Sequence, residues 1–224
     1  MMNDINVYSG LHFTDGTAGE ILDMKVTKAQ AQANRAHIVE TASTLFRERG
    51  YDGVGIADLM AGAGFTHGGF YKHFGSKADL MAEAATCGFA QTAAKAEGVD
   101  AMEFVKHYLS REHRDAPGDG CTMAALCGDA ARQTESIKTA FAAGVESLLA
   151  NLANQCGATE EGNQGGDARA MRIDVIAQVI GAIVLSRACP DDSQIADEIL
   201  DVCRTAVLSR LSSPTLGSSL AQIS

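Results

Sequence analysis

Apolar residues recur at helical spacing along most of the chain. Between about residues 31 and 49 they fall at i, i+4, i+7 and i+8, which places them on one face of an α-helix: Ile38, Ala42, Leu45 and Phe46. Gly50 follows this stretch as a C-cap. A second, short helix is predicted from about 56 to 63, with Gly55 as a weak N-cap. Gly64 supplies the tight turn after it.

The next segment predicts a third short helix that begins near Thr66 and carries two phenylalanines at i and i+4. At about 100° per residue, Phe70 and Phe74 share one face, and Thr66 and His73 flank it. The opposite face is basic, aromatic or bare backbone: Gly68 and Lys72, bordered by Gly69 and Tyr71. One side of this helix is therefore expected to be core and the other to be exposed.

Ser76, followed by Asp79 three residues later, is a capping-box-like start for a fourth helix from 77 to about 94. Further helices are predicted at about 100–114, 120–133, 135–155, 168–188 and 193–211, and a polar, glycine-rich loop spans 157–167. No segment has the alternating pattern of a β-strand. We therefore predict an all-α protein, with an N-terminal three-helix helix-turn-helix domain followed by a second helical domain.

The same pattern divides the chain into four parts. Residues 1–23 are polar and lack periodicity, so we expect a flexible N-terminal extension. Residues 24–80 form the helix-turn-helix domain, residues 81–212 form the second helical domain, and residues 213–224 are a tail rich in Ser, Pro and Gly. Met24 begins the helical pattern, which leaves Met1 and Met24 as alternative translation starts.

Charge is distributed unevenly along the chain. The formal net charge of −10 argues against a protein that coats nucleic acid. Residues 24–80, however, carry seven Lys and Arg against five acidic residues, whereas residues 81–224 carry eleven against nineteen. Only the helix-turn-helix segment can therefore approach a phosphate backbone without a large electrostatic penalty.

Composition and cysteine usage restrict the class of protein. Hydrophobic residues make up 46% of the chain and charged residues 21%, as in an ordinary globular protein. The 6 cysteines are too few and too irregularly spaced for a disulfide framework. We recognise no signal peptide, and the longest apolar stretch, residues 175–185, is too short for a membrane span. We therefore expect a cytoplasmic protein with reduced thiols and no membrane association.

Gly68 and Gly69 are the most informative residues of the third helix. Each glycine within a helix costs about 1 kcal/mol relative to alanine, so a pair requires a compensating gain. Close approach of the backbone to a bulky partner is such a gain, and a helix pressed into the major groove of DNA fits it. A phosphate can also meet the start of the fourth helix at Lys77, and the hydroxyls of Tyr71 and Thr66 can reach others. A loosely ordered loop is the alternative.

Residues 64–77 (GFTHGGFYKHFGSK), preceded by residues 46–51 (FRERGY), resemble the DNA-binding domain of the TetR family of repressors (AcrR-like). The resemblance is specific over about residues 33–80, and the rest of the chain has the expected length and helical pattern. The positions that match the family's DNA contacts are Thr66, His67, Gly68, Gly69, Tyr71, Lys72, His73 and Lys77. The chain departs from the family at Gly55 and Ala57, where a hydroxyl cap and a longer polar residue are common.

The resemblance further implies a homodimeric repressor whose C-terminal domain, residues 81–212, binds a small effector. Candidate effector-binding residues lie on the middle helices: Phe89, Phe104, His107, Tyr108, Met123 and Phe141. Helix 168–188 is apolar on more than one face and must be covered on both sides. With helix 193–211 it forms the predicted dimer interface, about 168–211, although a central helix of a monomeric bundle is the alternative. Effector binding is expected to release a pseudo-palindromic double-stranded DNA operator.

Three other interpretations stay open or are set aside. Cys121 is expected at a helix N-terminus, where the pKa of a thiol falls, so a thiol-redox-sensing repressor that uses Cys121 and Cys127 is an alternative. His107, His113 and Cys121 match no standard metal site, and we predict neither a metal nor a cofactor. No catalytic motif is visible, so we predict that the chain is not an enzyme. A helical enzyme and a protein-interaction module are the alternatives from other classes.

Overall fold

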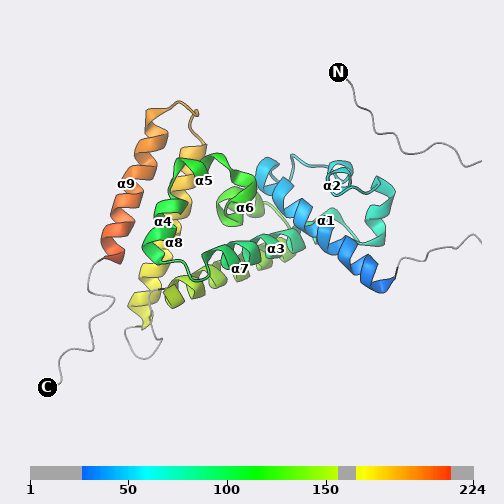
Figure 1. The fold of residues 1–224 in the computed structure, drawn as a ribbon, viewed down its shortest axis with the longest axis horizontal. Coiled ribbons are helices and arrows are strands. Elements are labelled where there is room, and N and C mark those ends of the chain that lie inside the picture. Colours follow the sequence, from blue (N-terminus) through cyan, green and yellow to red (C-terminus); the bar gives the residue numbers. More distant parts are fainter. Residues whose placement is uncertain (1–26, 156–164, 213–224) are drawn as a thin grey trace, which may run out of the picture.

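The computed structural model describes residues 27–155 and 165–212 of the chain (Figure 1). Within those two ranges the regular elements are helices and no strand occurs, which confirms the predicted all-α class. The predicted N-terminal extension, both candidate start methionines, most of the 157–167 loop and the tail from residue 213 lie outside the described residues.

The N-terminal part consists of α1 (Lys28–Arg49), α2 (Ile56–Gly62) and the 3-10 helix η1 (His67–Lys72). The predicted C-cap of α1 is confirmed, because Gly50 has a φ of 73°, which favours glycine. Gly55 is the N-cap of α2, as predicted. The bond that caps this helix comes from Asp58, whose carboxylate accepts the Gly55 N–H at 3.1 Å.

The third helix is a 3-10 helix, in which, for example, the His73 N–H donates to the Phe70 carbonyl at 2.9 Å. Two adjacent glycines weaken the α-helical preference of so short a segment, and 3-10 geometry is common in short pieces. The predicted sides of the helix are nevertheless confirmed. Phe70 and Phe74 are buried, whereas Gly68 and Lys72 are exposed.

Helix α3 (Lys77–Ala96) connects the two parts of the molecule. It begins where predicted, with the Ser76 hydroxyl accepting the Asp79 N–H at 3.1 Å. It packs against α1 on one side of the joint and against α7 (Glu135–Gln155) on the other (Figure 1). The boundary proposed after residue 80 therefore falls inside one continuous helix, which can transmit a tilt from one part to the other.

The C-terminal part is a helical bundle that also contains α4 (Ala101–Tyr108), α5 (Arg111–Asp115), η2 (Pro117–Asp119), α6 (Thr122–Ala130), α8 (Gly165–Arg187) and α9 (Gln194–Leu211). The single helix predicted over 100–114 is divided in two. Leu109 leaves helical geometry (φ −92°, ψ 48°), and the Ser110 hydroxyl then starts α5 by accepting the His113 N–H at 3.2 Å. The helix predicted over 120–133 is shorter at both ends.

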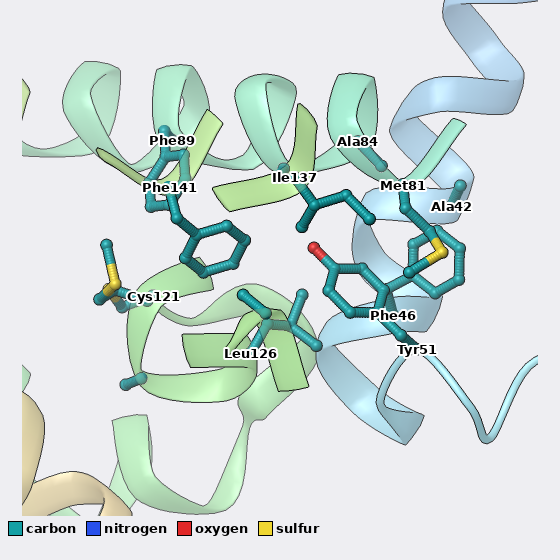
Figure 2. Packing of buried hydrophobic residues seen from close by; sticks show 14 of the residues in the cluster. Ala42, Phe46, Tyr51, Met81, Ala84, Phe89, Cys121, Leu126, Ile137 and Phe141 are labelled. Carbon is teal, nitrogen blue, oxygen red and sulfur yellow. The ribbon is translucent and has the colours of Figure 1, made fainter. Parts of the chain in front are cut away.

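The hydrophobic core continues from the N-terminal part into the bundle. Figure 2 shows Tyr51, from the loop after α1, beside Phe46, Leu126 and Ile137. All four side chains are at most 2% exposed. Because close-packed interiors transmit displacement, the N-terminal part cannot reorient without disturbing α6 and α7.

Candidate nucleic-acid interface and ligand cavity

The outer side of η1 presents a mixed surface to solvent. Of the six predicted contact positions in 66–72, Gly69 is half-buried. The other five are exposed: Thr66, His67, Gly68, Tyr71 and Lys72. The Tyr71 side chain is 66% exposed. An aromatic ring, a cationic side chain and bare backbone therefore lie together on one short helix.

Arg35 of α1 holds this helix in place from behind. Its guanidinium forms a bidentate ion pair with the carboxylate of Glu83 on α3. Its Nε also donates to the His73 carbonyl at 3.2 Å, and its charged group lies 4.7 Å from the centre of the Phe74 ring. Arg35 thus ties α1, α3 and the end of η1 together, which fixes the direction in which the outer side of η1 faces.

The glycines in and before η1 differ in whether the backbone or its surroundings require a residue without a side chain. Gly64 has a φ of 77°, so the turn between α2 and η1 requires glycine there. Gly68 has no positive φ, and a β-carbon added to it would meet no atom within 4 Å. A β-carbon on Gly69 would lie 3.5 Å from the Met60 methyl group, an ordinary contact. Nothing within the described residues therefore explains a glycine at position 68.

Two of the predicted contact residues turn their side chains inward. The Lys77 ammonium donates to the Tyr51 carbonyl at 2.5 Å and lies 5.9 Å from the centre of the Phe46 ring. His73 is half-buried, and its ring lies 6.4 Å from that of Phe65. Both side chains support the domain, so any phosphate contact from Lys77 has to use its backbone N–H at the start of α3.

A small apolar chamber of about 60 Å³ lies between α3, α4, α7, α8 and the start of α6. Most of its wall comes from aliphatic side chains of α7 and α8: Leu148, Leu152, Val175, Ile176, Val179 and Ile180. Its polar groups are few: Thr92, Tyr108, Cys121 and Asn151. No ionisable side chain other than the Tyr108 phenol and the Cys121 thiol lines it.

A more open cleft of about 490 Å³ adjoins this chamber and shares four wall residues with it, namely Thr92, Phe104, Tyr108 and Cys121. Most of its exposed wall is apolar, but the remaining residues include charged groups: Lys95, Glu103, Glu112 and Asp119, together with His107 and His113. A molecule in the two cavities would therefore meet hydrocarbon at one end and a wall with an excess of acidic groups at the other.

Three of the six predicted effector residues lie at these cavities. Phe104 and Tyr108 line both, and His107 lines the outer cleft. Phe89, Met123 and Phe141 line neither cavity and are packed within the core. Figure 2 shows Phe89 and Phe141 packed together, with ring centres 5.2 Å apart. These three residues are thus core residues and leave the candidate site.

The aliphatic wall from α8 is the part of the cavity that the sequence analysis missed. Helix 168–188 was expected to be covered on both sides, but its local pattern does not distinguish the side that faces the chamber from the side that faces away from the chain. Val175, Val179 and Ile183 are buried within the chain, whereas Ile173 and Val184 are exposed. The packing of α8 against α9 and α7, which decides this, is a long-range property of the fold.

His113 fixes the backbone at the edge of the cavity. Its Nδ1 lies 2.7 Å from the Tyr108 carbonyl, and its Nε2 accepts the Cys121 N–H at 3.2 Å. This network assigns the neutral tautomer with the proton on Nδ1. Burial lowers the pKa of His113 to about 4. With both ring nitrogens bonded to backbone groups, His113 serves as a structural brace.

Cys121 is the N-cap of α6, as predicted, and is 3% exposed. Cys127 follows six residues later, about 9 Å along the helix axis, which exceeds the Cα separation that a disulfide spans. Burial raises the pKa of the Cys127 thiol and so disfavours the reactive thiolate. A disulfide between the two would require α6 to unwind, so this geometry does not favour the thiol-redox alternative.

A buried arginine connects α1 to the wall of the cavity. Arg47 is 6% exposed, and its Nε donates to the Gly118 carbonyl at 2.7 Å. Its Nη1 donates to the hydroxyls of Ser43 at 2.7 Å and Thr122 at 3.5 Å. Thr122 directly follows Cys121, which lines the cavity, so the contact between Arg47 and Thr122 links α1 to the cavity wall. Sequence reasoning missed Arg47, because an arginine in a basic helix is usually exposed.

The outward faces of α8 and α9 are apolar. Five large side chains there are between 39% and 60% exposed: Ile173, Val184, Leu185, Ile195 and Val202. Ala177 and Gly181 continue the same stripe on α8, and a β-carbon on Gly181 would meet nothing within 4 Å. Helix α8 is thus covered by its own chain on one side, while the described residues leave the other side uncovered.

Within residues 27–155 and 165–212, no helix combines the length and hydropathy of a membrane-spanning segment. In the same ranges no group of three His, Cys, Asp or Glu side chains is placed to hold a metal ion.

Known proteins share the N-terminal part in sequence. Residues 38–84 match the family described as bacterial regulatory proteins, tetR family. The HTH-type transcriptional regulator AcrR of Shigella flexneri is 39% identical over 57 residues, which are 25% of this chain and 26% of that protein. The HTH-type transcriptional repressor DhaR of Mycobacterium sp. (strain GP1) is 46% identical over 43 residues, or 19% of this chain and 22% of that protein. The chain thus matches about a quarter of the length of these relatives.

Solved structures extend the likeness to the whole fold. A TetR transcriptional regulator from Chloroflexus aurantiacus J-10-FL has a TM-score of 0.63 at 20% identity, over 83% of this chain and 97% of that chain. The reduced form of NemR from E. coli has a TM-score of 0.61 at 18% identity, over 78% of this chain and 95% of that chain. At such identities the likeness shows the fold alone. Residues 38–84 therefore carry a domain of the tetR family of bacterial regulatory proteins, and the chain as a whole shares its fold with these solved structures.

Proposed function

We propose that the protein is a ligand-responsive transcriptional repressor that binds a pseudo-palindromic DNA operator as a homodimer and is released by a small-molecule effector. It acts in the cytoplasm, without a cofactor and without enzymatic activity. The observation that carries this proposal is the outer side of η1, where Tyr71 and Lys72 are exposed beside Gly68, a glycine that nothing within the described residues explains. The relatives AcrR and DhaR, a transcriptional regulator and a transcriptional repressor, support it.

The proposed DNA contacts are made by η1 and its flanks. Gly68 and Gly69 allow the backbone to approach the base edges in the major groove. Lys72 and the Tyr71 hydroxyl meet phosphates or base edges, and Thr66 and His67 contact the groove at the start of the helix. His73 contributes by holding η1 in place, and Lys77 contributes its backbone N–H.

A homodimer places two copies of η1 on one face of DNA. The uncovered apolar stripe of α8 and α9 is the proposed interface, about residues 168–211, and a partner's pair of helices would complete a four-helix arrangement. The exposed side of Gly181 allows a partner helix to approach closely, since no β-carbon intervenes. The two half-sites of the operator are then about one helical turn of DNA, or a multiple of it, apart.

Release follows from the connection between the cavity and α1. A ligand in the chamber presses on the segment around Cys121, and the next residue, Thr122, shares the Arg47 guanidinium with α1. Displacement of this contact, together with a tilt of α3, changes the spacing of the two η1 helices. The effector must prefer the conformation that does not fit the operator, because a ligand shifts an equilibrium only by its difference in affinity for the two states.

The proposal is tested by fluorescence anisotropy with two kinds of DNA: the region upstream of the protein's own gene, and sequences selected by the protein from a random library. Lys72→Ala should weaken binding, change the preferred sequence and reduce the salt dependence by about one phosphate contact per protomer. Lys138→Ala, an exposed lysine on α7, is the matched control and should leave both unchanged. Failure to select any sequence, or equal behaviour of the two variants, would contradict the proposal.

A further inference from the structure

Tyr108, a wall residue of the ligand cavity, carries a buried hydroxyl that lacks a conventional hydrogen-bond partner. Tyr108 is 6% exposed, and its hydroxyl makes no conventional hydrogen bond. The Cys121 thiol is close enough to interact with it, but a thiol is only a weak acceptor. Burial keeps the pKa of this phenol well above its ordinary value, so the group stays protonated and acts as a donor. A buried donor without a good acceptor favours a ligand that supplies one.

The position of Tyr108 decides where on the ligand that acceptor must lie. Tyr108 lines both the apolar chamber and the outer cleft, so its side chain forms part of the wall where the two adjoin, and its hydroxyl lies buried in that wall. The chamber alone, at about 60 Å³, is smaller than the cavity of about 150 Å³ that holds a benzene ring in an engineered protein. A ligand therefore places a small hydrocarbon group in the chamber and the rest of its body in the cleft.

Charge on the cavity walls excludes anions. The chamber presents no cationic side chain, and transfer of an ionised group into such surroundings is strongly unfavourable. In the cleft, Glu103 is paired with Lys106 at 2.5 Å, and the carboxylates of Glu112 and Asp119 outnumber Lys95, whose ammonium donates to the Asp119 carbonyl at 2.8 Å. A carboxylate or phosphate would therefore meet a small excess of acidic charge in the cleft and no cationic side chain in the chamber wall.

We infer that the effector is an uncharged, largely hydrocarbon molecule with one hydrogen-bond acceptor, such as a ketone oxygen, that accepts from the Tyr108 hydroxyl at the junction of chamber and cleft. This inference rests on the proposed function for the meaning of the cavity, but its binding chemistry stands on the lining residues alone.

Three probes of nine non-hydrogen atoms test the inference by calorimetric titration of the DNA-free protein: acetophenone, cumene and benzoate. Acetophenone and cumene share a ring and a branched substituent and differ in the acceptor, whereas benzoate carries a charge. Acetophenone should bind about ten-fold more tightly than cumene, as expected for one buried hydrogen bond, and benzoate should bind more weakly than either.

The variant Tyr108→Phe should reduce acetophenone binding about ten-fold, to the level of cumene, and leave cumene unchanged. Tyr51→Phe is the matched control, because Tyr51 is also buried with an unpartnered hydroxyl but lies outside both cavities. If Tyr108→Phe fails to fold, the acetophenone-to-cumene ratio in the unmodified protein still decides. Preference for benzoate, equal affinities for acetophenone and cumene, or no binding of any probe overturns the inference.

A separate measurement of operator binding distinguishes failure of the inferred ligand class from failure of the proposed regulatory function. The expected probe pattern without specific DNA binding would reject the regulatory function and leave the ligand class intact. Specific DNA binding with the wrong probe pattern would reject the ligand class alone.

Discussion

Replacing Gly68 with alanine separates the requirements of the fold from those of the interface. The added methyl group meets no atom within 4 Å, and the backbone at this position has no positive φ. An alanine that adopts the native backbone without strain stabilises a protein by about 0.4–1 kcal/mol, because the unfolded chain loses freedom. The structure therefore predicts that the free energy of unfolding stays the same or rises slightly.

Affinity for the operator should change in the opposite direction. If the η1 backbone lies against the DNA at Gly68, the new methyl group enters a packed interface, where such overpacking typically costs about 1–3 kcal/mol. Since 1.4 kcal/mol corresponds to a factor of ten, each η1 helix should lose roughly 5- to 150-fold in affinity. A dimer with two such helices loses more than one helix alone.

The assay pairs urea unfolding with fluorescence anisotropy on the selected operator. Gly128→Ala is the matched control, because Gly128 is exposed on α6 and its added β-carbon also meets nothing within 4 Å. It should match Gly68→Ala in stability and leave operator binding unchanged. Gly68→Ala with unchanged affinity for DNA would refute the reasoning that its bare backbone serves the groove.

Three further changes test the contact between α3 and α6, the edge of the cavity and the proposed dimer interface. Gly88→Ala places a β-carbon 2.2 Å from the Thr122 hydroxyl, so it should lower the free energy of unfolding by about 1–3 kcal/mol in urea titrations. The pKa of His113 is about 4 in the folded protein against 6.5 for the free side chain, so only the unfolded state binds a proton between these values. Stability should therefore be constant above pH 6.5 and fall by about 3 kcal/mol towards pH 4. In urea titrations at several pH values, His113→Gln should lose this pH dependence of the free energy of unfolding, and His107→Gln should keep it. Val202→Glu puts a charge on the uncovered stripe, and sedimentation velocity should then show a monomer that remains folded; a persistent dimer would place the interface elsewhere.

Local patterns predicted the end of α1 and the start of α3 well, because each of these caps depends on residues within one turn. Gly50 and Ser76 show this: one needs a positive φ, and the other needs only an N–H three residues later. The separation of buried Phe70 from exposed Lys72 was predictable for the same reason. The division of residues 100–114 into two helices was not, since the competing cap at Ser110 is a weak signal beside continuous apolar spacing.

Features that depend on distant residues were not accessible from the sequence. Lys77 was expected to meet a phosphate at the start of the fourth helix, and the sequence did not reveal that its ammonium bonds to the carbonyl of Tyr51, 26 residues earlier. The chamber wall from α8 and the buried position of Arg47 likewise follow from how helices pair in space. A pattern of period 3.6 shows that a face is apolar but does not show what covers it.

The environment of Arg47 limits how such regulators can be recombined. A chimera that joins the first three helices of this chain to the bundle of a relative would carry a buried guanidinium whose acceptors, the Gly118 carbonyl and the Thr122 hydroxyl, stay behind. A buried charge without its acceptors is among the most destabilising single defects in a folded domain. An exchange of DNA-binding specificity is therefore better made by substituting only the outer residues of η1, or by moving residues 117–122 together with α1.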